Sequence, residues 1–150
     1  MTSKYTILKF YEKSLMYIED AIGDKATNNV QLDKLGYSLF ASDYLGTFSA
    51  DKFPKYIREG QCFILNTDSS RSTNRYGHWV SFIKINKKLY YYDSYMRSPS
   101  KLSKYWKNRK MINANKIDRD ESYEESNCGQ RSMAFLILIK KFGERAVNVV

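Results

Sequence analysis

The 150-residue chain contains one histidine, two cysteines and two prolines, and its scarcities exclude several classes of protein. Two cysteines in unlike settings argue against a disulfide framework and for a reducing compartment. No stretch approaches the roughly 20 apolar residues that span a membrane, and the N-terminus lacks the pattern of a secretory signal. Internal repeats are also absent from the sequence. We therefore expect one domain over residues 1–150 that is not secreted and has no membrane partner.

The only histidine, His78, opens an alternating apolar run over residues 78–85 that predicts a half-buried strand. A short turn at residues 86–87 leads into a second predicted strand over residues 89–92, and Asp93 follows that strand directly. Because strands joined by a tight turn pair side by side, the pattern predicts that His78 and Asp93 lie close together.

Cys128 stands before the apolar run of residues 133–139, which predicts a helix. At a helix N-terminus the backbone N–H groups and the dipole favour a thiolate. A free thiol has a pKa of about 8.5, and a neighbouring imidazole activates it by accepting its proton. A carboxylate behind the imidazole fixes the imidazole tautomer. Cys128, His78 and Asp93 therefore have the residue types of a thiol protease triad.

Each of these three residues also has an ordinary structural interpretation. A lone histidine is more often structural than catalytic, and a cysteine at the start of an apolar helix is usually a small core residue. An aspartate before Ser94 can simply end a strand and begin a turn. In this order and with these neighbours, the three residues together favour the catalytic interpretation.

The neighbours of the triad belong to short motifs that resemble the adenovirus-type cysteine proteases, distant relatives of the proteases that process SUMO and other ubiquitin-like proteins. The resemblance covers residues 30–142, most of the chain. It rests on Leu-Gly-Thr-Phe, Phe-Pro, Ile-Leu-Asn-Thr, Gly-His-Trp, Tyr-Tyr-Asp-Ser and Asn-Cys-Gly, at residues 45–48, 53–54, 64–67, 77–79, 91–94 and 127–129. One such motif is a weak signal, whereas the ordered series is specific.

The resemblance implies an α+β fold, a papain-like or adenain-like cysteine protease domain whose central mixed β-sheet packs against the nucleophile helix. Residues 30–142 would form this core, and residues 1–25 would add an N-terminal helix. The residue pattern predicts further elements: a helix over 30–40 started at Asn28 or Asn29, strands near Cys62, His78 and Leu89, a helix over 100–110 and a short strand at 116–117.

By the same resemblance, Cys128 would be the nucleophile, His78 the general base and Asp93 the orienting acid. Adenoviral enzymes carry glutamate at the acid position and SUMO proteases carry aspartate, so this chain follows the latter. The substrate cleft would include Trp79, Asn127 and Gly129, and a polar loop at residues 67–75 could border it. A core role explains Trp79 equally well.

The chain departs from the family at the oxyanion hole. The family usually places a glutamine six or seven residues before the cysteine, where this chain has Ser122 and Glu121. Loss of an oxyanion donor typically costs about 2.7–4 kcal/mol of transition-state stabilisation. The candidates here are the Cys128 backbone N–H, the Ser122 hydroxyl and Glu121 if protonated. Gln130 lies on the helix side of the cysteine and is not expected to substitute.

Activation is the second departure. Adenoviral enzymes are switched on by DNA and by a viral peptide that forms a disulfide with a second cysteine. The second cysteine of this chain, Cys62, lies in an apolar run that predicts a buried strand, so a disulfide-linked activator is not expected. The sequence requires no cofactor and contains no expected metal site, and DNA or a viral peptide remains a possible activator.

An N-terminal helix over residues 7–22 precedes the region of resemblance, and Gly23 is expected to end it. We hypothesise that this helix packs on the domain and takes the place of the activating peptide; a plain structural helix is the alternative. Its predicted apolar stripe consists of Leu8, Tyr11, Leu15, Ile18 and Ile22.

The net charge of +9 points to a polyanionic partner. Basic residues cluster at 84–88 and at 101–110, where aromatic residues lie among them, as in surfaces that attract phosphates and stack bases. A solvated basic helix face explains residues 101–110 equally well. The candidate contacts for non-specific binding of viral DNA are Lys101, Lys104, Lys107, Arg109 and Lys110.

We therefore expect a monomeric thiol endopeptidase that cleaves viral capsid and other structural precursors during particle maturation. The resemblance implies cleavage after glycine, an adenovirus-like, polinton-like or virophage-type source, and a location in the virion and in the cytoplasm or nucleus of the infected cell. Two alternatives stay open. One is an enzyme like the deubiquitinases or SUMO proteases, acting on host conjugates. The other is a DNA-binding or capsid-associated protein whose triad has decayed.

Overall fold

The computed structural model describes residues 2–68, 70, 77–95, 110–114 and 126–150. Within these residues, five strands form one mixed sheet in the order β1-β2-β3-β4-β5. The strands are β1 (Tyr44–Phe48), β2 (Cys62–Asn66), β3 (Trp79–Ile85), β4 (Lys88–Tyr92) and β5 (Ile112–Asn113). The α-helices are α1 (Lys4–Ile22), α2 (Asn29–Phe40) and α4 (Cys128–Phe142), and short 3-10 helices lie at Ala41–Asp43, Ala50–Lys52 and Gly143–Ala146.

The centre of the sheet is antiparallel, as the predicted strands near residues 62, 78 and 89 require. β2 pairs with β3 and β3 with β4, while the outer strands β1 and β5 pair parallel to their neighbours. The β3–β4 turn contains Asn86 at φ 52° and Lys87 at φ 64°. Two positive φ values match the right-handed twist of the flanking strands, so this tight turn holds the two strands in register.

The sheet is covered on both faces, which corrects the prediction of a half-buried strand after His78. Residues 79–83 of β3 are all buried. Phe63 and Phe82 stack on one face with ring centroids 4.9 Å apart, whereas Ile83 belongs to the core cluster on the other face, which includes α4. The alternation in the sequence is real, but packing on the second face buries the alternate side chains as well.

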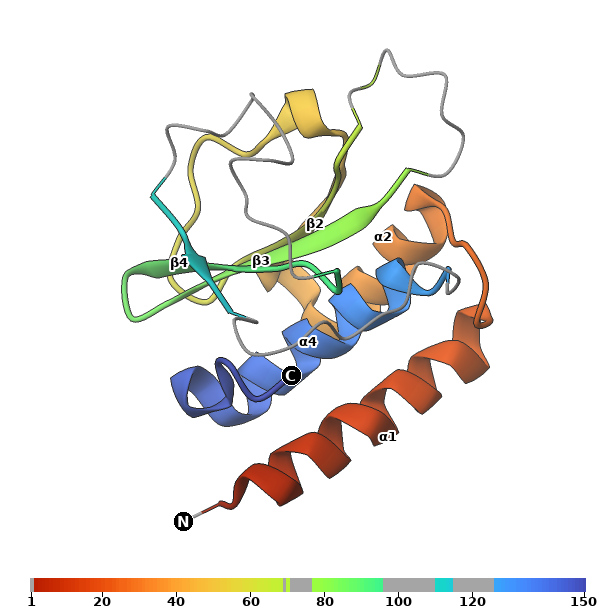
Figure 1. Ribbon diagram of the computed structural model, residues 1–150. Helices are drawn as coiled ribbons and strands as arrows, with labels where there is room; N and C mark the ends of the chain where they lie inside the picture. Colours follow the sequence, from red (N-terminus) through yellow and green to blue (C-terminus); the bar gives the residue numbers. More distant parts are fainter. Residues whose placement is uncertain (1, 69, 71–76, 96–109, 115–125) are drawn as a thin grey trace.

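Helix α4 lies between the sheet and α1, as Figure 1 shows. Its side chains are buried almost all round, because β2 and β3 cover one side and α1 covers another. The prediction that the helix beginning at Cys128 packs against a central mixed sheet is confirmed. Among the described residues, no helix combines the length and the apolar character that crossing a bilayer requires.

The predicted N-terminal helix is present as α1, and Gly23 ends it at φ 87°. At its start, the Ser3 side chain accepts a hydrogen bond from the Thr6 N–H. The buried stripe is Ile7, Tyr11, Ser14 and Ile18, whereas Leu8, Leu15 and Ile22 are only partly buried. The predicted stripe is therefore confirmed at Tyr11 and Ile18 and differs at Ile7 and Ser14, so the buried face is rotated slightly from the predicted one.

Helix α2 starts where the sequence predicts. The Asn28 side chain accepts from the Gln31 N–H, and the Gln31 side chain accepts from the Asn28 N–H, a reciprocal capping box. Strand β1, next to α2, was not among the predicted strands. The predicted helix over 100–110, the predicted strand at 116–117 and most of the polar loop at 67–75 lie outside the described residues.

We predict that α1 contributes to the cooperative stability of the domain. Ile18 on α1 is completely buried, so Ile18→Ala should lower the free energy of unfolding by about 2–5 kcal/mol in urea denaturation. Met16→Ala on the same helix is the matched control, because Met16 is 66% exposed and should change stability by less than about 0.5 kcal/mol. Equal effects of the two changes would show that α1 is not part of the cooperative core.

Candidate active site

His78 and Asp93 are brought together by the β3–β4 hairpin, as predicted. His78 lies directly before β3 and Asp93 directly after β4, and these two strand ends are adjacent because the strands are antiparallel. The distance from His78 Nε2 to Asp93 Oδ1 is 2.6 Å. The His78 side chain is 10% exposed and that of Asp93 is fully buried. This short contact is therefore shielded from water, as an orienting carboxylate requires.

Two further groups hold the Asp93 carboxylate, and the sequence analysis identified neither. The Tyr95 backbone N–H donates to Asp93 Oδ1 over 2.9 Å, and the Tyr91 hydroxyl donates to Oδ2 over 3.4 Å. The Tyr95 ring also stacks on the His78 imidazole at a centroid distance of 4.5 Å. An aspartate at the end of a strand is the signal of an Asx turn, in which its side chain accepts from the backbone N–H two residues on, and it could have predicted the Tyr95 contact.

Cys128 is the first residue of α4 and is 8% exposed. The backbone N–H of Trp79 donates to Cys128 Sγ at 3.4 Å. One turn further along α4, the Ser132 hydroxyl donates to the Trp79 carbonyl oxygen over 3.1 Å. The peptide groups on either side of Trp79 thus attach the sulfur and its helix to the start of β3, directly beside His78.

Two members of the predicted triad, His78 and Cys128, line one cavity. A hollow of about 280 Å³ is lined by Ala26, Thr27, Gly77, His78, Trp79, Tyr95, Ser126 and Cys128. Since Asp93 takes the Nε2 side of the imidazole, Nδ1 is the ring nitrogen left for the thiol proton. The hollow is therefore lined by a thiol and an imidazole, with a carboxylate buried behind the imidazole.

Trp79 is both a core residue and a lining residue of this cavity. Its side chain is 7% exposed and belongs to the core cluster around α4. It also lines the cavity beside Cys128, and its indole Nε1–H donates to the Thr27 carbonyl oxygen over 3.1 Å. On its other side, Trp79 lines a neighbouring polar hollow of about 550 Å³ that contains residues from β1 and from the loop after β2.

Asn127 and Gly129, predicted as cleft residues, are not among the described residues that line the cavity. The Asn127 side chain donates to Glu19 on α1 over 3.3 Å and accepts from Arg131 over 3.0 Å. Gly129 is packed so closely that an added Cβ would lie 2.5 Å from Thr27 Cγ2. Both residues secure the start of α4.

The oxyanion hole is only partly within the described residues. Ser122 and Glu121 lie outside them, whereas the Cys128 N–H belongs to the first turn of α4, where N–H groups lack helical partners. The Gln130 amide donates to the carbonyl oxygens of Gly23 and Lys25 over 2.8 and 2.7 Å. These bonds use its N–H groups, consistent with the expectation that Gln130 does not supply the oxyanion donor.

Cys62 is a core thiol, as the sequence indicated. It is fully buried in β2, and both it and Cys128 are free cysteines. Burial raises the pKa of the Cys62 thiol to about 12, so it stays protonated and unreactive at neutral pH. Within the described parts of the chain, no group of three or more histidine, cysteine, aspartate or glutamate side chains could hold a metal ion.

Of the predicted nucleic-acid contacts, Lys110 is exposed and lies just before β5, whereas Lys101, Lys104, Lys107 and Arg109 lie outside the described residues. In comparisons with known proteins, no protein-family model matches the chain and no curated protein matches it significantly. The geometry of the site is therefore the basis on which function is proposed.

We predict that the two cysteines differ sharply in reactivity. Cys128 should be alkylated by iodoacetamide well below the pH of about 8.5 at which a free thiol ionises, because the helix N-terminus and His78 stabilise its thiolate. Cys62, with its raised pKa and complete burial, should react far more slowly than Cys128 across the same pH series in the folded protein. Peptide mass spectrometry of samples quenched across a pH series measures both rates.

The matched variant for this measurement is His78→Ala, which removes the imidazole and leaves the helix N-terminus intact. Its Cys128 rate profile should shift to higher pH than that of the wild type, because only the helix N-terminus then stabilises the thiolate. Identical pH profiles for the wild type and the variant would contradict a thiolate–imidazolium pair.

Proposed function

We propose that this protein is a cysteine endopeptidase of the adenovirus type with a papain-like fold. The observation that carries the proposal is the buried His78–Asp93 contact of 2.6 Å in the wall of a cavity that also contains Cys128 at a helix N-terminus. A structural histidine needs no reactive partner, and a core cysteine needs no cavity. Their combination with a carboxylate that orients the imidazole is the requirement of thiol-based acyl transfer.

The first half of the reaction forms a thioester. His78 accepts the Cys128 thiol proton, and the sulfur attacks the carbonyl carbon of the scissile peptide bond. The Cys128 N–H would donate to the resulting oxyanion. When the C–N bond breaks, the imidazolium returns the proton to the leaving amine. Asp93 stays ionised and stabilises the imidazolium throughout this half-reaction.

The second half consumes water. His78 takes a proton from a water molecule while the water oxygen attacks the thioester carbonyl carbon. Collapse of this second tetrahedral intermediate breaks the C–S bond, releases the carboxylic acid and returns the proton to the thiol. Tyr95, stacked on the imidazole, and Tyr91, bound to Asp93, keep the ring and the carboxylate in place during both transfers.

We propose capsid and other structural precursors of a virus as substrates, with cleavage after glycine. The resemblance of the sequence motifs supports this choice. The small cavity also supports it, since about 280 Å³ between Trp79 and Tyr95 suits an extended chain with small side chains near the scissile bond. An enzyme that acts on ubiquitin-like conjugates would use the same triad and differs in requiring a folded partner beyond the cleaved bond.

We predict that the purified protein hydrolyses denatured polypeptides and that Cys128→Ala abolishes the activity. His78→Ala should lower kcat/KM by about 10²–10⁴-fold, the usual contribution of general acid–base catalysis. Mass spectrometry of new N-termini in a digested peptide library measures both the activity and the residue before the cleaved bond. Cys62→Ala is the matched control and should retain activity, since Cys62 lies in the core.

The outcomes separate the candidate functions. Cleavage of unfolded peptides after small residues supports the endopeptidase. Cleavage confined to a ubiquitin-like protein with an intact fold would instead support a SUMO-protease-like enzyme. Ordinary reactivity of Cys128 with no cleavage, in the presence and absence of DNA, would favour a protein whose triad has decayed.

We further propose that the protein binds nucleic acid without sequence specificity through a basic groove. This groove lies at the end of the sheet opposite to His78 and Asp93. This groove of about 820 Å³ has no acidic residue among the described residues that line it. Its basic residues are Lys55, Arg58, Lys84, Lys87, Lys88 and Lys110, and its apolar or aromatic residues are Tyr56, Ile57, Leu89, Met111 and Ile112.

The basic side chains of this groove favour contacts with phosphate groups over the binding of a buried ligand. Tyr56 is 88% exposed, a position from which an aromatic ring can stack on a base. The seven residues of β3 separate His78 from the hairpin turn. At about 3.3 Å per residue, the groove therefore lies roughly 20 Å from the triad. DNA bound there would leave the cavity open to substrate.

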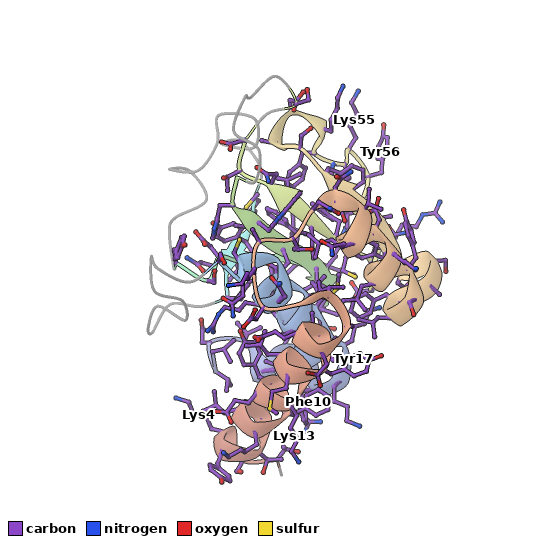
Figure 2. The ribbon with its side chains drawn as sticks, turned by 90° about the vertical axis from the view of Figure 1, so that its right-hand side faces the viewer. Lys4, Phe10, Lys13, Tyr17, Lys55 and Tyr56 are labelled. Atoms are coloured by element: carbon purple, nitrogen blue, oxygen red, sulfur yellow. The ribbon has the colours of Figure 1, made fainter. Side chains whose placement is uncertain are left out.

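We predict that Lys87→Glu combined with Lys110→Glu weakens binding of a fluorescent oligonucleotide and lowers the slope of log K against log salt by about two, one for each lost phosphate contact. Lys4→Glu with Lys13→Glu is the charge-matched control; these residues lie on α1, at the end of the molecule away from Lys55 and Tyr56 (Figure 2). Equal losses of oligonucleotide affinity in both double variants would indicate diffuse attraction to the net charge and would contradict binding at the groove.

A further inference from the structure

The linker between α1 and α2, residues 23–28, forms part of the cavity around Cys128. Ala26 and Thr27 line that cavity together with His78 and Trp79. The linker precedes residues 30–142, the region whose motifs suggest a protease. One wall of the cavity therefore comes from a segment that the motifs do not include.

Alternate backbone carbonyl groups of this linker accept hydrogen bonds from side chains on α4 and β3. The Gln130 side-chain amide donates to the Gly23 and Lys25 carbonyl oxygens over 2.8 and 2.7 Å. The Trp79 indole donates to the Thr27 carbonyl oxygen over 3.1 Å. α4 and β3 thus hold the linker by its backbone.

The hydrogen bonds to Gln130 are shielded from water. The Gln130 side chain is completely buried, so loss of its N–H groups would leave two carbonyl oxygens without their donor in a site with little access for solvent. Thr27 Cγ2 lies in contact with the backbone of Gly129, where an added Cβ would be only 2.5 Å away. The linker therefore has no room to move toward α4 and is restrained from moving away.

Helix α1 also contacts the chain around the site at two points. Glu19 accepts a hydrogen bond from Asn127, the residue before the nucleophile, over 3.3 Å. The Tyr11 and Tyr92 hydroxyls are 3.1 Å apart, both residues are buried, and Tyr92 is the residue before Asp93. α1 thus contacts the chain directly next to the proposed nucleophile and directly next to the proposed acid.

We propose that Gln130 is a positioning residue that holds the linker of residues 23–28 as a wall of the substrate cleft, and that this wall limits the size of the group that reaches Cys128. The proposal deepens the proposed peptidase function and rests on it for the kinetics, whereas the width of the cleft is measurable without any substrate. Ala26 and Thr27 are the residues of the wall, and Trp79 is its second anchor.

The test is size-selective labelling of Cys128 in Gln130→Leu, which keeps the volume of the side chain and removes both donors. Second-order rates are measured at one pH with iodoacetamide, a small reagent, and with fluorescein maleimide, a bulky one. The ratio of the bulky to the small rate should rise about tenfold, because the wall loses two hydrogen bonds. The iodoacetamide pH profile should be unchanged, since the triad itself is intact.

Tyr90→Phe is the matched control for loss of a partly buried hydrogen bond. The Tyr90 hydroxyl donates to Glu144 at the far end of the sheet from Cys128. This variant should leave the labelling ratio at the wild-type value. A similar rise in both variants would show that general loosening, rather than the linker, sets access, and would overturn the proposal.

A second pair of variants is independent of whether Gln130→Leu folds. Ala26 is exposed and lines the cavity, so Ala26→Leu should fold and lower the labelling ratio about tenfold by narrowing the entrance. Lys25→Leu adds the same side chain one residue away, where it does not line the cavity, and should change nothing. If Ala26→Leu and Lys25→Leu give the same labelling ratio, the proposal is overturned.

Peptide kinetics separate failure of this proposal from failure of the proposed function. If the wild type cleaves peptides, Gln130→Leu should raise KM by about tenfold with kcat within about twofold, because the wall binds substrate and does not transfer protons. If the wild type cleaves no peptide while the labelling ratios still shift as stated, the proposed peptidase function is wrong and the proposed role of the linker as a wall is supported. Cleavage with unchanged ratios and unchanged KM would reject the wall alone.

Discussion

The complete burial of the Asp93 carboxylate is the constraint on which this end of the molecule depends. A buried charge without partners costs several kcal/mol, so its neighbours must supply donors in good geometry. His78, the Tyr95 N–H and the Tyr91 hydroxyl do so, and they come from the start of β3, the turn after β4 and β4 itself. A slip of one residue in the β3–β4 register would turn Asp93 to the other face and separate it from His78. The contact between His78 and Asp93 therefore requires the correct pairing of β3 with β4.

Helix α4 joins the core to the site. It is covered by the sheet and by α1, so it cannot shift without opening the core, and its first residue is the proposed nucleophile. Ser132 ties it to the Trp79 carbonyl, and Gln130 ties it to the linker after α1. Close packing at Gly129 removes the remaining freedom. The same contacts that stabilise the domain thus fix the sulfur relative to His78, which is the preorganisation that nucleophilic catalysis needs.

Local patterns predicted the elements that local interactions stabilise. Asn28 and Gln31 cap α2 reciprocally, Gly23 ends α1 at a positive φ, and residues 86–87 make the hairpin turn, all within a few residues along the chain. The same patterns missed β1 and the burial of both faces of β3, because burial depends on what packs from elsewhere. The stripe of α1 was placed around Leu8 instead of Ile7, since its rotation is set by α4 and not by its own periodicity.

By itself, the sequence determined which residues have the chemistry of a thiol nucleophile, an imidazole base and a carboxylate, and the hairpin that joins two of them. Their types and their order are properties of the chain, and a tight turn brings His78 and Asp93 together without help from distant residues. Only the tertiary structure decided that Cys128 joins them, that Tyr95 covers the imidazole and that residues 23–28 form a wall held by Gln130. These contacts link elements far apart in the sequence, and packing in three dimensions selects them, which no local pattern encodes.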